Sequence, residues 1–588
     1  MKKLYISIVT LLIAQYSFAQ WPANYEGVML QGFYWNSFED TQWTKLTEQA
    51  DELSTYFNAI WVPNSAYCTD GRSMGYDPLY WFRHKSTFGE LRDLKIMIST
   101  YKDKGVSIIE DVVLNHKKPQ GKTVDHDGKK EKSWIDFANE TFKIKGESYS
   151  VTWSGADICR NDDGGYTAQK GWEVTGADDT GDDFSGFRDL DHTSANVQNN
   201  VKLYLRYLLE ELGYDGFRLD MVKGYAGRFN KTYNEAVNPK FCVGEYWDGY
   251  DAITNWMNST GKTSAAFDFP LKYQLNKACN GDWGALGDKG IAGDPNWNRY
   301  SVTFVDNHDT YEKGSDRLAN NVIAANAIIL ALPGTPCIFL KHWQQYPIAI
   351  GNMILARKAA GLTNQSSITE QYKSGNGYVI KTQGSKGSVL CLCGMPNYDT
   401  TGWKCISAGQ NYAYYVSSNI DVSGLRPGSD EPAAQVTVPE CVKPIEGHVY
   451  CYFLANKDYP APNAWVWNEN KNYNTNGEWP GDAMQKVGND GNGHDVYCWD
   501  GGVSDNQMPT GVVFSNGTGS PQTADFVFFN GGYYDASGFL ATATTGMQQI
   551  KNATVSDSSK ITYTLTGQRA ANSYRGIVIK NGRKYMQK

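Results

Sequence analysis

The sequence lacks several patterns that would assign it to common functional classes. It contains no Cys-x-x-Cys pair and no His-Glu-x-x-His motif, so a zinc site of the usual kinds is not expected. Acidic residues outnumber basic ones, and the formal net charge of -8 argues against a nucleic-acid-binding protein. Beyond the first twenty residues no long apolar run occurs, so we expect no membrane span.

What is present is the composition of a globular protein. Of the 588 residues 41% are hydrophobic and 20% are charged, which excludes collagen, coiled coil and wholesale disorder and predicts several domains. The 18 Trp and 38 Tyr suit flat, uncharged ligands such as sugars, although a large aromatic core explains them equally well. The 11 Cys are an odd number, and we expect them to be mostly buried and unpaired, with disulfides left open.

The two ends of the chain differ from the rest. Residues 1–20 combine two lysines, a short apolar run and small residues, which is the pattern of a secretory signal peptide. We therefore expect a secreted protein, either extracellular or at the cell surface. Residues 555–588 contain two short alternating runs and resemble the C-terminal sorting tails of the bacterial type IX export pathway. A terminal hairpin without that role is an equal alternative.

Between residues 21 and 362 a short β-rich run that ends in polar or aromatic residues is repeatedly followed by helical periodicity. Eight such runs occur, at 27–33, 59–62, 106–109, 215–220, 241–245, 265–269, 301–306 and 335–339. Alternating strands and helices predict a parallel sheet, and eight units predict an α/β fold of the (β/α)8 TIM-barrel type. Active sites of this barrel form at the carboxyl ends of the strands, where this sequence places its carboxylates.

Four of these strand ends carry candidate catalytic residues, in segments 111–116, 216–224, 244–247 and 304–309. Hydrolysis of a glycosidic bond needs a protonated acid beside the leaving oxygen and an ionised carboxylate beneath the anomeric carbon. Asp220 and Glu245 end neighbouring predicted strands. Asp220 is suited to the task of the ionised carboxylate, and Glu245 to that of the protonated acid. We expect Arg218, on the same face as Asp220, to keep that carboxylate ionised, whereas Glu245 needs a raised pKa. Asp309 supplies a third carboxylate.

These segments resemble the signature regions of glycoside hydrolase family 13, the α-amylase family, over about residues 21–440. Motifs such as Val28–Trp35 and Gly244–Asp248 are most similar to its plant-type members. The resemblance implies that Asp220 is the nucleophile, Glu245 the general acid/base and Asp309 the stabiliser of the transition state. It also implies that the substrate is contacted by Tyr76, His116, Arg218, Lys223 and His308. Trp35 and Trp247 are either stacking walls or core residues.

The segment inserted after the third strand, about residues 117–188, is rich in Asp, Gly and Asn. Its composition alone favours a solvated acidic loop. The family resemblance implies instead a bound Ca²⁺, held by Asn115, Asp179 and Asp189 and by the carbonyl groups of Asp182 and Gly224. Arg188 and Asp182 depart from the residues that plant-type members usually carry, so the path of this loop is left open.

Two β-rich regions follow the barrel. Residues 363–442 predict an antiparallel β domain, and residues 447–541 a β-sandwich. The sandwich resembles the starch-binding modules of carbohydrate-binding module family 26, which implies that Trp467, Trp479 and Gln522 contact the ligand. From the pattern alone, these tryptophans are as well explained as the core of a small sandwich.

The sequence therefore predicts a monomeric, secreted, calcium-dependent retaining endo-hydrolase of α-1,4-glucosidic bonds, acting on starch and maltooligosaccharides. A glucanotransferase of the same family is the first alternative, because it shares every catalytic residue. A non-catalytic starch-capture protein is the second alternative. The presence of all three candidate acids, Asp220, Glu245 and Asp309, argues against it.

Overall fold

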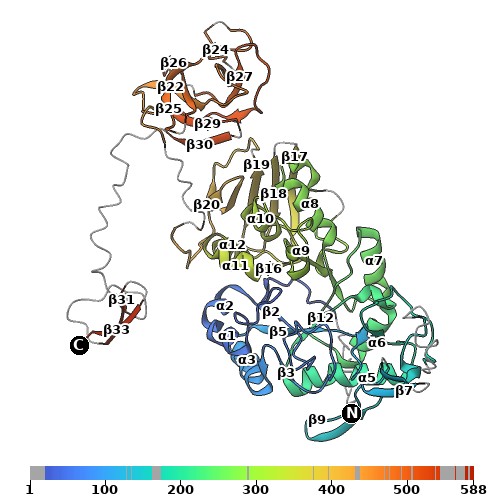
Figure 1. Ribbon diagram of the computed structural model, residues 1–588. Coiled ribbons are helices and arrows are strands. Elements are labelled where there is room, and N and C mark those ends of the chain that lie inside the picture. The colour runs from blue at the N-terminus through green and yellow to red at the C-terminus, as the bar shows by residue number, and fades with distance from the viewer. Residues whose placement is uncertain are drawn as a thin grey trace, which may run out of the picture. The chain divides into compact units, whose positions relative to one another are not determined.

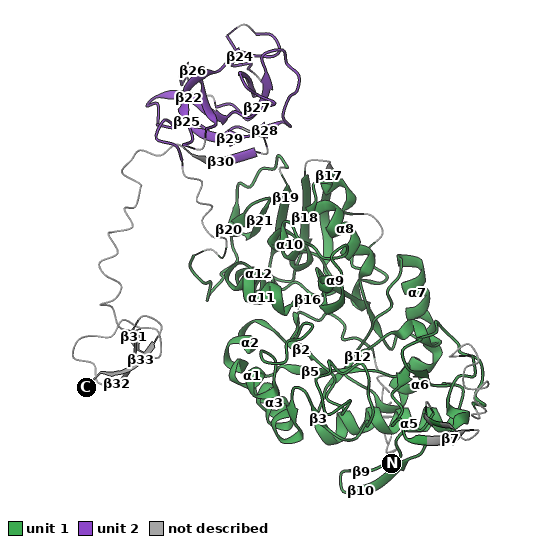
Figure 2. Cartoon of the chain, viewed as in Figure 1, with its two compact units in different colours: residues 1–432 green, residues 433–588 purple. Residues whose placement is uncertain are grey.

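The structure is a computed structural model of the chain (Figure 1). It describes residues 20–587 except 127–128, 134, 162–173, 288–289, 375–376, 395, 429, 431–437, 469–470, 476, 492, 505–507, 537, 543–562, 565–575 and 581–582. The predicted signal peptide thus lies almost wholly outside the described residues. The chain divides into two compact units, residues 1–432 and 433–588 (Figure 2).

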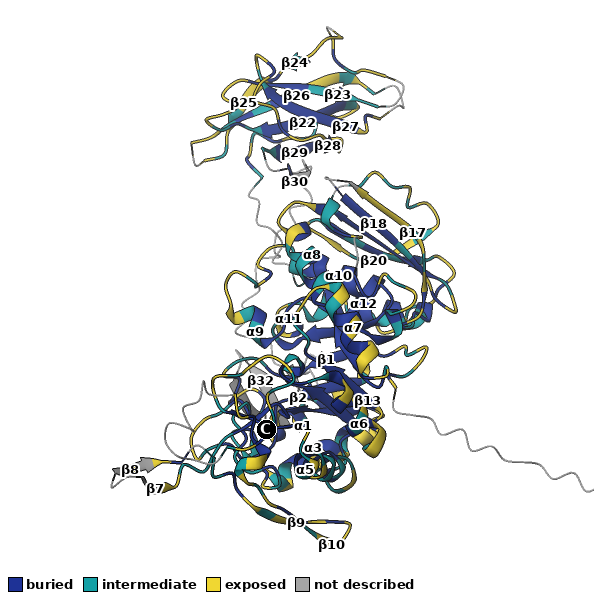
Figure 3. Cartoon of the chain, turned by 90° about the vertical axis from the view of Figure 1, so that its right-hand side faces the viewer, coloured by how far each residue is buried: buried dark blue, intermediate teal, exposed yellow. Residues whose placement is uncertain are grey.

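The first unit is built around a closed barrel of parallel strands. These are β1 (Met29–Gln31), β2 (Ala59–Val62), β5 (Ser107–Val112), β12 (Gly216–Leu219), β13 (Phe241–Gly244), β14 (Ala265–Phe267), β15 (Ser301–Phe304) and β16 (Thr335–Phe339). Each of the eight predicted runs supplies one strand, which confirms the (β/α)8 prediction. Every residue of these strands is buried, as expected of a parallel sheet covered on both faces (Figure 3).

The helices of the first unit alternate with these strands along the chain. They are α1 (Trp43–Glu48), α2 (Ala50–Tyr56), α3 (Leu91–Asp103), α5 (Ala195–Tyr207), α6 (Gly227–Val237), α7 (Tyr250–Ser259), α8 (Phe269–Cys279), α9 (His308–Glu312), α10 (Val322–Ala331), α11 (Leu340–Gln345) and α12 (Pro347–Ala360). Nine of the ten residues of α10 are buried, because this helix lies between the barrel and the following β domain. Among the described residues, no helix is both long and apolar enough to cross a membrane.

The insert between β5 and β12 forms short antiparallel pairs. Its strands are β6 (His116–Lys117), β7 (Thr123–His126), β8 (Lys129–Lys132), β9 (Glu140–Ile144), β10 (Glu147–Val151) and β11 (Arg188–Asp189). β11 pairs with β6, so that Asp189 lies opposite His116. The backbone N–H of Leu190 also donates to the Asn115 carbonyl at 2.8 Å. The end of the insert is therefore tied to the strand from which it departs.

A five-stranded antiparallel sheet follows the barrel, as predicted. Its strands are β17 (Ser367–Ser374), β18 (Gly377–Gln383), β19 (Ser388–Gly394), β20 (Trp403–Gly409) and β21 (Tyr412–Ser417). The sheet packs on α10, where the Tyr414 hydroxyl donates to the Leu330 carbonyl at 3.0 Å. Nine of the eleven cysteines are buried, as expected, including Cys391 and Cys393 on β19.

The second unit contains two facing antiparallel-rich sheets, the predicted sandwich. One holds β22 (His448–Leu454), β25 (Gln485–Asn489), β26 (Asp495–Val503), β29 (Gly532–Asp535) and β30 (Gly538–Thr542); the other holds β23 (Pro462–Trp467), β24 (Asp482–Ala483), β27 (Gly511–Asn516) and β28 (Phe526–Val527). Val442 packs into the first sheet's core, so residues shortly before 447 already belong to this unit. Near the C-terminus, β31 (Tyr563–Thr564), β32 (Gly576–Lys580) and β33 (Arg583–Gln587) form a small sheet.

Candidate active site

A single buried guanidinium organises the carboxyl end of the barrel. β12 lies between β5 and β13, and Arg218 is paired in register with Asp111 of β5. Nη1 of Arg218 donates to Oδ1 of Asp111 at 2.8 Å and to Oδ1 of Asp220 at 2.7 Å, and Nη2 lies 2.8 Å from Oε1 of Glu245. One cation therefore meets three carboxylates, two of them the candidate nucleophile and acid.

The three contacts of Arg218 are not equivalent. Those to Asp111 and Asp220 are aligned hydrogen bonds. The contact to Glu245 is short but misaligned, and neither Nη2 of Arg218 nor Oε1 of Glu245 makes a hydrogen bond in the described part of the chain. The other carboxylate oxygen of Glu245 accepts a bond of 3.2 Å from the Met221 backbone N–H. Arg218 therefore stabilises a charge on Asp220 more directly than a charge on Glu245.

Burial dominates the titration of this pair. It raises the pKa of Asp220 and of Glu245 to about 7 each, against the opposing effect of the Arg218 charge. Glu245 thus has the raised pKa that we expected. We expected Arg218 to keep Asp220 ionised, and its charge does oppose protonation, but the desolvation of this carboxylate outweighs that attraction, so the pKa of Asp220 is raised as well. Near neutral pH the pair shares about one proton. The better hydrogen bond to Asp220 favours Glu245 as its carrier.

Asp309, in α9 shortly after β15, completes the cluster. Oδ1 of Asp309 accepts a bond of 3.1 Å from the Trp35 indole, and Oδ2 lies 3.3 Å from Nε2 of His308. Burial raises the pKa of Asp309, but the attraction of His308 and Arg218 outweighs it, so the pKa lies below its ordinary value. Asp309 is therefore ionised near neutral pH.

Tyr76 and His308 form one wall of the cluster. The two rings are stacked with centroids 5.4 Å apart and an interplanar angle of 4°. The Tyr76 hydroxyl donates to Oδ2 of Asp111 at 2.9 Å and lies 2.7 Å from Nε2 of His308. Tyr76 thus contacts Asp111, and His308 lies beside Asp309.

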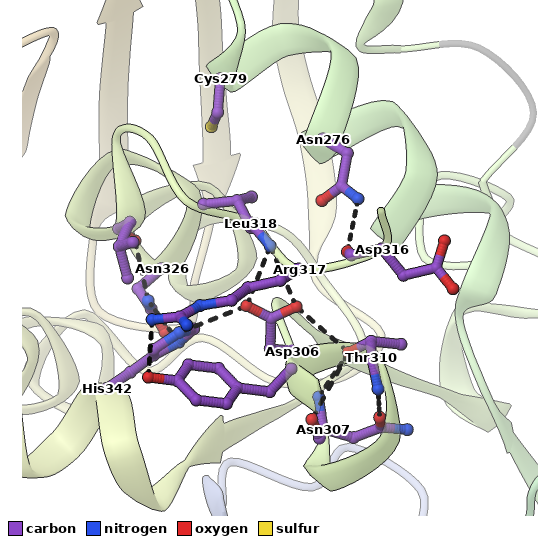
Figure 4. A network of polar contacts seen from close by, with 12 residues as sticks. Asn276, Cys279, Asp306, Asn307, Thr310, Asp316, Arg317, Leu318, Asn326 and His342 are labelled. Carbon is purple, nitrogen blue, oxygen red and sulfur yellow. Dashed lines mark hydrogen bonds and ion pairs between the residues drawn. The ribbon is translucent and has the colours of Figure 1, made fainter. Parts of the chain in front are cut away.

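The turn that carries His308 and Asp309 is anchored from behind by Asp306 (Figure 4). Asp306 accepts bonds from Lys272 Nζ at 2.8 Å, from Thr310 Oγ1 at 3.1 Å and from the Leu318 backbone N–H, and it lies 3.5 Å from His342. Lys272, Asp306 and His342 are buried. The turn that carries His308 and Asp309 is therefore held by a buried charge network.

Two predicted contact residues lie at the edge of the cluster. Nε2 of His116 bonds the Tyr76 carbonyl at 2.9 Å, and its ring stacks on Phe184, so it supports the turn that carries Tyr76. Nζ of Lys223 lies 3.0 Å from Asp248 and 3.5 Å from Asp182, away from the three acids.

Trp35 and Trp247, which the sequence allowed as either stacking walls or core residues, also differ. Trp35 is partly buried and donates to Asp309. Trp247 stacks on Phe269 at 4.9 Å and donates to the Tyr273 hydroxyl at 2.8 Å. Trp35 thus belongs to the acid cluster, and Trp247 does not contact it.

Three residues of the cluster had no role assigned from the sequence. Asp111 bonds Arg218, the Trp61 indole donates to Asp111 at 3.2 Å, and Nε2 of Gln31 lies 2.9 Å from Nδ1 of His308. A polar residue that interrupts an apolar strand, as Gln31 and Asp111 do, is the signal that points to them. Only the register of the closed barrel brings them to Arg218 and His308.

The predicted calcium ligands converge at the junction of the insert and the loop after β12. Oδ1 of Asn115 and Oδ2 of Asp179 are buried without a hydrogen-bond partner in the described part of the chain. A Cβ on Gly224 would lie 1.9 Å from Oδ1 of Asn115, so this oxygen faces Gly224. Nδ2 of Asn115 bonds Asp189 at 2.8 Å, and the Asp182 N–H bonds the Lys223 carbonyl at 2.9 Å.

This donor set suits a hard cation. Buried oxygens without donors are costly unless a cation satisfies them, and amide, carboxylate and carbonyl oxygens are the ligands that Ca²⁺ prefers. Burial also raises the pKa of Asp179, as expected for a carboxylate without a counter-charge. In the described residues no group of three or more His, Cys, Asp or Glu could hold a metal ion. A Ca²⁺ site here would therefore need the Asn115 amide and backbone carbonyl groups in addition to the carboxylates of Asp179 and Asp189.

Trp465, Trp467 and Trp479 of the sandwich lie outside its core. On β23, Ala464 and Val466 are buried, whereas Trp465 and Trp467 alternate with them and are partly exposed. Trp479 is 44% exposed, and its ring centroid lies 6.1 Å from that of Trp465. Gln522 is exposed and bridges to Ser515 of β27. The core interpretation of Trp467 and Trp479 therefore does not hold.

Known proteins resemble both units. The family described as "Alpha amylase, catalytic domain" matches residues 46–342, just over half of the chain, and "Starch-binding module 26" matches residues 451–528. Two relatives come from Arabidopsis thaliana. The chloroplastic alpha-amylase 3 is 29% identical over 58% of this chain and 38% of its own length. The probable alpha-amylase 2 is 28% identical over 66% of this chain and 93% of its own length. A glucan 1,4-alpha-maltotetraohydrolase of Stutzerimonas stutzeri is 29% identical over 70% of this chain and 76% of its own.

Proposed function

The chain belongs to the family of the α-amylase catalytic domain, and on that premise we propose that it hydrolyses α-1,4-glucosidic bonds in starch and related glucans with retention of configuration. As a member of this family it is a glycoside hydrolase. The observation that carries the proposed mechanism is the unequal contact of Arg218 with Asp220 and Glu245. This difference favours an ionised Asp220, which can act as the nucleophile, and a protonated Glu245, which can act as the acid.

In the first step the Asp220 carboxylate attacks the anomeric carbon while Glu245 gives its proton to the glycosidic oxygen. The bond between that carbon and that oxygen breaks, and a glycosyl ester of Asp220 forms. Arg218 holds Asp220 in the ionised form and at a fixed position beneath the sugar. The raised pKa of Glu245 supplies the proton near neutral pH.

In the second step Glu245, now ionised, takes a proton from water, and the hydroxide so formed attacks the same carbon. The ester bond breaks, and Asp220 regains its charge. Asp309 is ionised throughout and stabilises the positive charge that develops on the sugar ring in both transition states. Its bond from Trp35 keeps the carboxylate in place.

The test is chemical. A fluorinated glucosyl substrate that slows the second step should trap an ester on the peptide that contains Asp220, detected by mass spectrometry. Products released from amylose should carry the α configuration by NMR. An ester on another residue, or β products, would overturn the assignment. The product profile over time separates endo-hydrolysis from the release of short units at chain ends and from transfer to a second glucan.

The sandwich is proposed to hold starch near the barrel. Sugar rings have apolar faces, and the partly exposed rings of Trp465, Trp467 and Trp479 offer a platform for them, with Gln522 as a polar contact. The match of residues 451–528 to a starch-binding module supports this role. Such an attachment raises the local concentration of barrel near insoluble starch without changing the active site.

A Ca²⁺ ion is proposed at Asn115, Asp179, Asp189 and the carbonyl groups of Asp182 and Gly224. When bound, it supplies positive charge that satisfies the buried oxygens of Asn115 and Asp179. The residues themselves join β5, the insert and the loop that follows Asp220. They thereby brace the nucleophile's strand end indirectly.

Export of the protein is proposed from residues 1–20, and sorting to the cell surface from residues 555–588. The first segment supports this by its charge and apolar pattern, and the second by its resemblance to type IX tails. Mass spectrometry of the protein isolated from culture medium and from cell surfaces should find residues 1–20 removed, and deletion of residues 555–588 should abolish its arrival there. An intact N-terminus on extracellular protein, or unchanged export of the truncated chain, would contradict the proposal.

A further inference from the structure

Gln31 touches the active site through one histidine. It is the last residue of β1, it is 1% exposed, and Nε2 of its amide lies 2.9 Å from Nδ1 of His308. The two residues are separated by 277 positions in the chain. Nothing in the mechanism above uses Gln31, so its buried amide needs an explanation.

The direction of each hydrogen bond between Arg218 and His308 can be worked out from the Arg218 end. A guanidinium can only donate, so Asp111 accepts from it, and Asp111 also accepts from the Trp61 indole. Asp111 is therefore an acceptor on both oxygens, and the Tyr76 hydroxyl must donate to it. The Tyr76 oxygen then accepts from Nε2–H of His308 at 2.7 Å. This leaves Nδ1 of His308 without a proton, and that nitrogen needs a donor.

The surroundings of His308 keep its ring neutral. The ring lies among Phe33, Trp35, Trp61 and Tyr76, and burial lowers its pKa to about 4. Among charged groups, Asp309 favours the imidazolium, whereas Arg218 and Lys313 oppose it. A neutral ring carries one proton, and which nitrogen holds it decides what His308 can donate.

We propose that Gln31 is a positioning residue, whose amide N–H donates to Nδ1 and holds His308 in the tautomer protonated at Nε2. In this form Nε2–H points toward Tyr76 and Asp309, and a hydroxyl of the bound sugar can share this N–H with the Tyr76 oxygen. The opposite tautomer would present a bare nitrogen to the Asp309 carboxylate, 3.3 Å away, and would repel it. The sugar contact rests on the proposed function; the tautomer does not.

The first experiment reads the tautomer directly in the full-length protein. Histidine labelled with ¹⁵N distinguishes the two tautomers by NMR, and loss of a resonance in His308→Asn identifies the ring. Wild type should show the Nε2–H form. Gln31→Met keeps the size of the side chain but cannot donate, so the population of the Nε2–H form should fall, although Tyr76 and Asp309 still favour it. A wild-type ring protonated at Nδ1 would overturn the proposal.

Gln31→Glu gives a result that packing alone does not predict. A carboxylate at this position accepts a hydrogen bond from Nδ1–H, so it raises the pKa of His308 and reverses the neutral tautomer. Above this new pKa the ring loses its Nε2–H, and kcat should fall as pH rises. Below it, the imidazolium keeps Nε2–H, and kcat should recover. A Gln31→Glu ring that keeps the wild-type tautomer and pKa would contradict the proposal.

The kinetic arm compares Gln31→Met with Asn234→Leu, which removes another fully buried amide, on α6, that bonds Thr263 and lies outside the cluster. Gln31→Met should lower kcat on soluble maltooligosaccharides roughly tenfold to hundredfold, as loss of a partner behind a functional histidine does, with little change in KM. Asn234→Leu should change only stability. Equal kcat in Gln31→Met and wild type would overturn the proposal. A wild type inactive on every glucan would sink the proposed function but leave the NMR result to decide the tautomer.

Discussion

The centre of the barrel and the open face of the sandwich are both proposed to contact glucan, yet they are built in opposite ways. The barrel site consists of buried charges that contact one another, with Arg218 and Asp111 each 1% exposed or less. The sandwich site consists of neutral aromatic rings that remain partly exposed, and Trp479 is 44% exposed. Catalysis needs fixed charges in a desolvated place, whereas capture needs only accessible apolar faces.

This difference predicts different responses to substitution. Buried charges depend on one another, so the loss of one leaves its partners unsatisfied. Exposed rings act through their own contact area, and their loss leaves the rest of the module intact. Changes in the barrel should therefore alter rates and stability together, and changes in the sandwich should alter only binding to insoluble starch.

The largest effect is expected at Asp220. Asp220→Asn removes the proposed nucleophile, so kcat on soluble maltooligosaccharides should fall by at least about 10³. Adsorption to starch granules should be unchanged, because the sandwich is untouched. Asp251→Asn, an exposed change on α7, is the matched control and should keep full activity. Near-wild-type turnover in Asp220→Asn would remove this residue from the mechanism.

The next effect concerns the network behind the catalytic turn. Asp306→Asn leaves the buried Lys272 ammonium without its partner, and breaking such a pair should lower the free energy of unfolding by about 3–5 kcal/mol. Denaturant titration of the barrel measures this change. The double variant Asp306→Asn with Lys272→Met removes both charges and should recover part of the loss. If the double variant is less stable than the single one, the network does not depend on this pair.

Metal removal should separate the two units. A ligand that binds only the folded barrel stabilises it by about 3–4 kcal/mol at 100–1,000 times Kd. Excess chelator should therefore lower the melting transition of the barrel and leave that of the sandwich in place, and added Ca²⁺ should restore the first. An unchanged barrel transition, with metal loss verified by elemental analysis, would count against the calcium site.

The pH dependence should reflect the coupled pair of carboxylates. The productive form has Asp220 ionised and Glu245 protonated, and burial raises both pKa values to about 7. The ratio kcat/KM should therefore peak near neutral pH, falling toward tenfold per pH unit on either side. Lower pH protonates the nucleophile, and higher pH removes the proton of the acid. A profile that stays flat from about pH 5 to 9 would show that this pair does not control the rate.

The same raised pKa values affect stability. The folded barrel holds protons on Asp220 and Glu245 that the unfolded chain releases, so their contribution to stability is present below about pH 4 and is lost as pH rises to about 7. Asp220→Asn should therefore melt higher relative to wild type at pH 7 than at pH 4. A constant difference between the two pH values would argue against the raised pKa of Asp220.

The smallest effect is expected from the sandwich. The paired change Trp467→Ala and Trp479→Ala should weaken granule adsorption and slow granule digestion several-fold, as the loss of a second attachment point does. Hydrolysis of short soluble substrates should stay within about twofold, because these occupy only the barrel. Trp403→Ala, at a partly exposed position on β20 of the first unit, is the control and should leave adsorption unchanged. If the paired variant lost activity on short soluble substrates, the proposal that the sandwich acts only in binding insoluble starch would be wrong.

Much of the fold was predictable from local pattern. Each of the eight predicted runs became a barrel strand. The spacing of Trp465 and Trp467 placed them on one face of β23 but left open whether that face was core or exposed, and the structure leaves both partly exposed. The raised pKa of Asp220 was not apparent from the sequence, because sequence proximity to Arg218 says nothing of how completely the carboxylate is buried. Gln31 and Asp111 stood in recognised motifs, yet their partners were not apparent from the sequence.

The sequence by itself determined the order of strands and helices, the acids that end the strands and the aromatic residues of the sandwich, because periodicity and residue type act over a few positions. Only the tertiary structure decided that Arg218 meets Asp111, Asp220 and Glu245 with unequal geometry, and that Gln31 meets His308 across 277 positions. Such contacts depend on closure and register of the whole barrel. The burial that raises the pKa of Asp220 and Glu245 likewise exists only once every strand and helix is in place.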